Sequence, residues 1–123
     1  MARLQAGVIR YASVAREIGR ALGVTPEPEI RIGQWRLTIT FRRLGASRWP
    51  EAQQMDFAFR VAELARATLA AHKRSAVRGR AARAIVVAYE DAANVRGCAV
   101  TARWECAIPA AGERWAPPHK RRD

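Results

Sequence analysis

Residues that perform catalysis or bind metals are scarce in this sequence, and the scarcity excludes most enzyme classes. Its 123 residues include two His, two Cys and 11 Asp and Glu. With so few candidates, the sequence supports no Ser-His-Asp or Cys-His arrangement. Metal-dependent nucleases need clustered carboxylates, and acidic residues are sparse here. The glycine-rich phosphate loops of the Walker or dinucleotide type are also missing. We therefore expect a non-enzymatic protein with no catalytic residues, no metal site and no cofactor.

The two cysteines, Cys98 and Cys106, are too far apart in the chain to form a disulfide within one strand. Eight residues of strand span roughly 26 Å at about 3.3 Å per residue, whereas a disulfide needs Cα atoms within about 7 Å. We expect both to be small core residues of a reduced chain. Long apolar runs and a secretory signal pattern are absent too, which predicts a cytoplasmic protein without a membrane partner.

Three acidic residues are the remaining candidates for a metal site. Glu90 and Asp91 are adjacent near the end of an expected strand, and Glu105 lies on the polar side of the next strand. These carboxylates could meet across a hairpin. The simpler interpretation is that Glu105 pairs with Arg103 or with an arginine on a neighbouring strand.

Positive charge is what the sequence has in excess. Lys and Arg number 22, which gives a formal net charge of +11, and only Lys73 and Lys120 are lysines. Such a surplus on a small surface creates a positive field that attracts phosphate-rich or acidic partners. The planar fork of arginine suits phosphate in particular.

The chain alternates between helical and strand-like periodicity. Apolar residues recur at three- and four-residue steps in two segments, and apolar and polar residues alternate in others. Residues 84–90 are ambiguous, but the β-branched run Ile85, Val86 and Val87 favours a strand. The expected elements are a helix at 7–22, a hairpin at 29–43, a helix at 49–73 and strands at 84–90 and 98–108.

This order predicts an α+β fold, a two-layer sandwich with the element order αββαββ. Strands that arrive in consecutive pairs favour an antiparallel sheet of about four strands, with both helices on one face. The length allows one domain, which we place at residues 1–108. Residues 109–123 contain several prolines and end in basic residues, which predicts a flexible basic tail.

Residues 14–25, VAREIGRALGVT, resemble the first helix and turn of a helix-turn-helix DNA reader. The resemblance covers only these twelve residues. That motif needs a second helix directly after the turn, where this chain has Pro26, Glu27, Pro28 and Glu29. An ordinary amphipathic helix that ends at Gly23 is the better interpretation.

Basic residues in three groups are the candidates for contact with nucleic acid or another partner. Two share the polar face of a strand with Thr38 and Thr40, five come from the cationic segment 73–83, and three end the chain. Exposed aromatics for base stacking are not evident. The candidates are Arg36, Arg42, Lys73, Arg74, Arg78, Arg80, Arg83, Lys120, Arg121 and Arg122.

These observations predict a small interaction protein that binds nucleic acid or a nucleoprotein complex through arginine-rich surfaces. Such binding is electrostatic and only weakly sequence-specific. One alternative is a phage- or plasmid-type inhibitor, of the anti-CRISPR or anti-restriction class, that docks on a host protein complex. Another is a structural ring protein, because the element order is similar to that of small phage tail-completion proteins.

Overall fold

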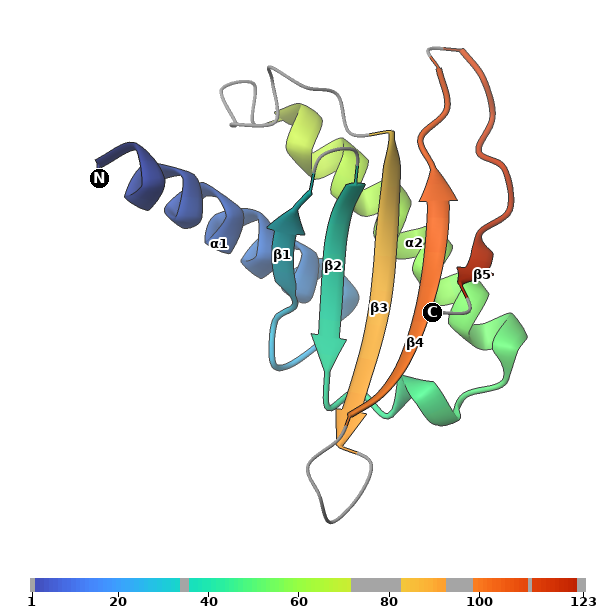
Figure 1. The fold of residues 1–123 in the computed structure, drawn as a ribbon. Helices are drawn as coiled ribbons and strands as arrows, with labels where there is room; N and C mark the ends of the chain where they lie inside the picture. Colours follow the sequence, from blue (N-terminus) through green and yellow to red (C-terminus); the bar gives the residue numbers. More distant parts are fainter. Residues whose placement is uncertain (1, 34–35, 72–82, 93–98, 111, 122–123) are drawn as a thin grey trace.

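The structure, a computed structural model, describes residues 2–33, 36–71, 83–92, 99–110 and 112–121. Two helices lie on the same face of one sheet, which confirms the predicted α+β class, and no described helix or strand covers the other, open face (Figure 1). The elements are α1 (Ala2–Leu22), β1 (Glu29–Ile32), β2 (Arg36–Arg42), the 3-10 helix η1 (Ala46–Arg48), α2 (Glu51–Ala71), β3 (Ala84–Ala92), β4 (Ala99–Ala107) and β5 (His119–Arg121).

The sheet differs from the prediction in having five strands and one parallel pair. Its order is β1-β2-β3-β4-β5, so every strand lies beside its neighbour in the chain. The pairs β1–β2 and β3–β4 are antiparallel as predicted, but β2 and β3 are parallel, with Arg36 opposite Ala84 and Arg42 opposite Glu90. In the chain, α2 lies between β2 and β3 and runs back along the face of the sheet. A helical crossover of this kind lets adjacent strands run parallel.

The fifth strand comes from the segment that the sequence assigned to a flexible tail. His119–Arg121 pair antiparallel with Arg103–Glu105 of β4. In the segment that connects β4 to β5, Trp115 packs on Phe59 of α2, and the guanidinium of Arg66 lies over the Trp115 ring. These contacts give this part of the tail a fixed place beside α2 and β4.

Alternation along the central strands separates the two faces of the sheet. On β2, Leu37, Ile39 and Phe41 are buried under the helices, while Arg36 and Arg42 are exposed. The ambiguous segment is a strand, β3, and its Ile85, Val87 and Tyr89 are buried on the same side. The strand prediction for residues 84–90 is therefore confirmed.

The helix α1 ends as the sequence predicted. Gly23 has φ +67°, a conformation that costs other residues free energy because of their Cβ. Its N–H donates to the Arg20 carbonyl and that of Val24 to the Gly19 carbonyl, the Schellman arrangement that closes helix C-termini. The chain then enters β1 rather than a second helix, so the likeness to a helix-turn-helix reader does not extend past the turn.

The helix α2 packs closely on the sheet because its buried residues are small. Ala58, Val61, Ala62 and Ala65 have no exposed surface. Cys106 of β4 lies against this helix, with its Sγ 3.9 Å from the Ala58 carbonyl oxygen. Cys106 is therefore a core residue, as predicted, whereas Cys98 lies outside the described residues. Within the described part of the chain, neither helix has the length and apolar composition that a membrane span needs.

A buried glutamine joins four elements of the fold. Gln54 of α2 is 2% exposed. Its Nε2 donates to the Ala46 carbonyl of η1 at 2.9 Å, and its Oε1 accepts from Trp104 Nε1 of β4 at 3.0 Å. Its own carbonyl accepts a hydrogen bond from the Tyr89 hydroxyl of β3 at 2.6 Å. Buried polar groups need such partners, and here they anchor the start of α2 to the sheet.

Candidate nucleic-acid interface

The sheet face opposite the helices carries basic residues from several strands. Strand alternation and the observed register place on this open face five arginines, which come from β1, β2, β4 and β5. Three glutamates share the face, so it has an excess of two positive charges. Its arginines are Arg31, Arg36, Arg42, Arg103 and Arg121, and its acids are Glu29, Glu90 and Glu105.

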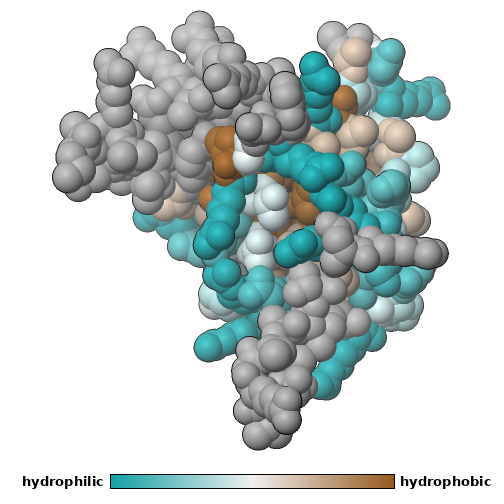
Figure 2. Space-filling model, in the orientation of Figure 1, coloured by the Kyte–Doolittle hydropathy of each residue, from teal (hydrophilic) through white to brown (hydrophobic). Residues whose placement is uncertain are grey.

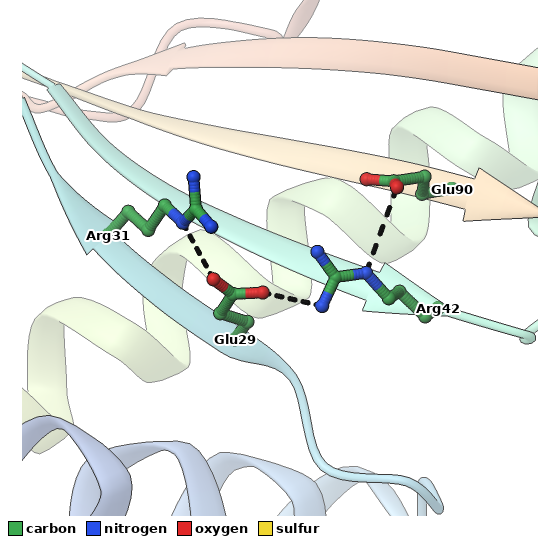
Figure 3. A network of polar contacts seen from close by, with 4 residues as sticks. All are labelled: Glu29, Arg31, Arg42 and Glu90. Carbon is green, nitrogen blue, oxygen red and sulfur yellow. Dashed lines mark hydrogen bonds and ion pairs between the residues drawn. The ribbon is translucent and has the colours of Figure 1, made fainter. Parts of the chain in front are cut away.

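One cluster of charges spans β1, β2 and β3 (Figure 3). The Glu29 carboxylate accepts from Arg31 Nε at 2.6 Å and from Arg42 Nη1 at 2.5 Å. Arg42 also faces Glu90, with its Nε 3.7 Å from that carboxylate. Hydrogen bonds from Arg31 and Arg42 lower the pKa of Glu29, and the bond to Glu29 raises the pKa of Arg42. Both groups therefore stay ionised at neutral pH.

A second cluster centres on Glu105 of β4. Its Oε1 lies 3.0 Å from Arg36 Nε and 3.4 Å from Arg121 Nη1. The sequence predicted that Glu105 would pair with Arg103 or with an arginine on a neighbouring strand. Its partners are in fact Arg36, which reaches across β3 from β2, and Arg121 on the neighbouring β5.

Between the two clusters the open face is made of small side chains. Thr38 and Thr40 are half-buried, and Val86 and Ala88 are each 3% exposed because longer side chains flank them. Figure 2 shows the same face, with a strip of intermediate hydropathy bordered by hydrophilic side chains. Arg103 lies opposite Ala88 on this face, is exposed, and has no ion pair within the described parts of the chain.

The structure brings together only some of the predicted contact residues. Arg36 and Arg42 lie on the polar face of their strand, as predicted, and Arg121 joins them on the open face. Arg83 is exposed just before β3, where its carbonyl accepts from the Ile108 N–H at 2.9 Å. The other candidates, Lys73, Arg74, Arg78, Arg80 and Arg122, lie outside the described residues.

Lys120 is the predicted contact residue that lies away from this face. It is opposite Trp104 in the register, so it points to the helix side of the sheet. Its Nζ lies 2.7 Å from the Glu51 carboxylate at the start of α2. The sequence could not show this, because the side of the sheet depends on a strand that was expected to be a tail.

The acidic residues do not meet as a metal site. In the strand register, Glu90 lies opposite Thr101 and Glu105 lies opposite Val86. The two glutamates are therefore four strand positions apart, or roughly 13 Å at about 3.3 Å per residue. Asp91 has a structural contact instead, because its carboxylate accepts a hydrogen bond from the Gly45 N–H at 2.9 Å. No group of three or more potential metal ligands occurs in the described ranges.

Arg31 and Arg103 belong to the open face but were not among the predicted contact residues. The alternation of β4 already separated Arg103 and Glu105 from the apolar positions. What the sequence lacked was the register that places these residues beside Arg36 and Arg121. No protein-family model, curated protein or solved structure matches this chain, so the geometry of the open face is the basis on which a function can be assigned.

Proposed function

We propose that this protein binds nucleic acid, bare or in a nucleoprotein complex, through the open face of its sheet. The observation that supports this most directly is the presence of five arginines on one face that no described helix or strand covers, and one of them, Arg103, has no ion pair within the described parts of the chain. Phosphate groups are among the ligands that the arginine fork fits geometrically, and they are the repeating feature of every nucleic acid.

The glutamates on this face are compatible with phosphate binding. A guanidinium has five N–H donors, and the ion pairs of Arg36 and Arg42 occupy only part of them. The carboxylates hold these side chains across the strands rather than leaving them to move freely. A held guanidinium loses less conformational entropy when it binds a phosphate.

The spacing along β2 suits contacts to more than one phosphate. Arg36 and Arg42 are six residues apart, which is roughly 20 Å along a strand at about 3.3 Å per residue. Thr38 and Thr40 lie between them on the same face, and threonine hydroxyls donate to phosphate oxygens. The strand therefore offers a row of donors that can follow a sugar–phosphate backbone.

The cationic segment 73–83 joins the sheet at the same end as Arg36. It follows α2 and leads to Ala84, which lies opposite Arg36 in the register. Arg83, the described residue of this segment, is exposed there, and its charge adds to the field at that end of the open face. We therefore propose that Arg74, Arg78, Arg80 and Arg83 contribute to affinity together with the open-face arginines.

Recognition at this surface is expected to be weakly sequence-specific. The described positions of the open face include no Phe, Tyr or Trp on which bases could stack, and stacking is the usual contact of single-strand binders. We expect binding to duplexes of different sequence to be similar at equal salt, because phosphate contacts do not depend on the base.

The proposal is tested by titrating a fluorescent duplex and a single strand of the same length across a salt series. We expect the logarithm of the binding constant to fall linearly with the logarithm of salt, with a slope of about −0.9 for each phosphate contact to duplex. The double variant Arg31→Gln/Arg103→Gln should make the slope shallower by one to two contacts, because both side chains lie on the open face.

The matched control is Arg48→Gln/Arg60→Gln, which removes two exposed arginines from η1 and α2 in the helical layer. Both double variants have the same net charge, so a general charge effect would weaken both equally. An equal loss in the two variants would exclude the open face as the binding surface. Absence of binding at low salt would exclude nucleic acid as a direct ligand.

A further inference from the structure

The outer edge of β1 has the donors and acceptors of a strand that lacks its second neighbour. β1 is the first strand of the sheet order, and no described strand pairs with its outer side. The Gly33 N–H donates to the Arg36 carbonyl at 2.8 Å. Hydrogen bonding alternates along an antiparallel strand, so residues 29, 31 and 33 face β2, and the N–H and C=O groups of Ile30 and Ile32 face outward.

The same edge has an exposed apolar side chain. Ile32 is 47% exposed, the large hydrophobic residue that the described parts of the chain leave in solvent. It lies opposite Leu37, a residue buried under the helices, and therefore points to the helix side of the sheet. A neighbouring strand and a helix beneath it would cover Ile32.

The helical layer extends further than the sheet on this side. The N-terminal half of α1 projects past β1 in Figure 1, whereas Val14, Ala15 and Ile18 of its C-terminal half are buried in the core. A strand added at the outer edge of β1 would continue the sheet over this overhang. A second copy of the chain provides both the strand and a matching overhang, because a two-fold interface is self-complementary.

We propose that two copies of this chain pair antiparallel through β1 to form one continuous sheet of ten strands. The register follows from charge. If Ile30 lies opposite Ile30 of the second copy, Glu29 of each copy lies opposite Arg31 of the other, and the outward groups of the two Ile30 residues bond to one another. A shift by two residues would place Arg31 opposite Arg31 of the second copy, and directly opposed like charges destabilise a sheet.

The opposite edge of the sheet is less suited to this pairing. β5 has three residues, follows Pro117 and Pro118, and is exposed at His119 and Lys120. Short, charged edge strands next to proline discourage further strand addition. Pairing through β1 uses the main-chain groups of the sheet edge, so it can be measured without nucleic acid, although Glu29 and Arg31 also belong to the open face.

The test is the oligomeric state of the full chain, measured by sedimentation equilibrium in high salt without nucleic acid. We expect a monomer–dimer equilibrium, and Ile32→Lys should raise the dimer dissociation constant at least tenfold. Ala110→Lys, which adds the same charge at an exposed position after β4, is the matched control and should leave the constant within about twofold. A wild-type chain that stays monomeric at all concentrations would overturn the proposal.

Exchanging the charges of Glu29 and Arg31 tests the register. Recovery of dimerisation when the two variants are mixed shows that neither variant is simply misfolded. Glu29→Arg alone and Arg31→Glu alone each place like charges opposite one another at both positions of the homodimer, so each should dimerise at least tenfold more weakly. When the two variants are mixed, both pairs again have opposite charges, and native mass spectrometry should show heterodimers of nearly wild-type affinity. The Ile32→Lys variant could dimerise as tightly as the wild type, and the mixed charge variants no more tightly than each variant alone. These two results together would place the interface elsewhere and refute pairing through β1.

Discussion

At the scale of single residues, the polar group that most constrains the core is Gln54. Its amide donates to main-chain carbonyls and accepts from Trp104, and its carbonyl accepts from Tyr89. Because this side chain is almost completely buried, water cannot replace a lost partner. This single glutamine therefore joins α2, η1 and two strands.

Gln54→Leu is expected to destabilise the fold by about 2 kcal/mol. The change leaves the Trp104 N–H buried without a partner, and an unsatisfied buried group costs about 1–3 kcal/mol. The Ala46 carbonyl keeps its hydrogen bond from the Trp49 N–H at 3.1 Å. Urea unfolding followed by tryptophan fluorescence measures the effect. The neighbouring Gln53→Leu is the control, because Gln53 is exposed and surface changes usually stay within about 0.5 kcal/mol. Equal stability of the two variants would show that the buried network adds nothing.

At the scale of elements, chain ends and turns decide where each helix and strand stops. Gly23 closes α1 and directs the chain into β1, and Asp91 accepts from Gly45 to hold the connection between β2 and η1. The strand β5 is held near α2 by two contacts, one of Trp115 in the preceding segment with Phe59 and one of Lys120 in the strand itself with Glu51. These local contacts set the length and order of the sheet.

Gly23→Ala tests the end of α1. A Cβ at Gly23 would meet no atom within 4 Å, so the expected loss of about 1 kcal/mol reflects only the positive φ. Gly23→Asn should lose less, because Asn adopts this conformation more readily. Thermal unfolding of the three proteins measures the order. A Gly23→Ala variant as stable as the wild type would mean that the left-handed conformation is not required.

At the scale of the whole molecule, the charge excess and the buried core respond to different conditions. The net charge of +11 comes mainly from arginines, which stay protonated at any pH at which proteins fold. The core contains Cys106 and Tyr89 in neutral form. Burial raises the pKa of Cys106 to about 11 and also raises the pKa of Tyr89.

We expect the free energy of unfolding to fall as the pH rises above about 9. Unfolded cysteine loses its proton near pH 8.5–9, whereas folded Cys106 keeps its proton until about pH 11. The unfolded chain therefore binds fewer protons in this range, and the linkage sign gives a loss on the order of 1 kcal/mol per pH unit. The stability contribution is fully present below pH 8.5 and is lost as the pH approaches 11.

Urea midpoints at pH 7.5, 9 and 10 measure this dependence, with Cys106→Ala as the control. The control should show a weaker decline, because it removes the thiol and leaves Tyr89 in place. A pH profile that is identical in the two proteins would show that Cys106 does not titrate differently in the folded and unfolded states.

The candidate surface was predicted in its composition but not in its extent. Arg36 and Arg42 were identified because polar and apolar residues alternate regularly along β2. This alternation shows which side of the strand faces solvent. Arg121 was predicted as part of a basic end, and Lys120 with it, but only the pairing of β5 with β4 shows that they point to opposite sides. Arg103 needed the register of β4 against β3 and β5, which no local pattern specifies.

The sequence by itself determined the two helices, the first four strands, the α+β class and the positive charge, because periodicity, glycine placement and residue counts are local properties. Only the tertiary structure decided that β2 and β3 run parallel, that His119–Arg121 form a fifth strand, and that Glu105 pairs with Arg36 across β3. Each of these depends on contacts between residues distant in the chain. Their free energy comes from packing α2 and Trp115 against the sheet, which no short window of sequence contains.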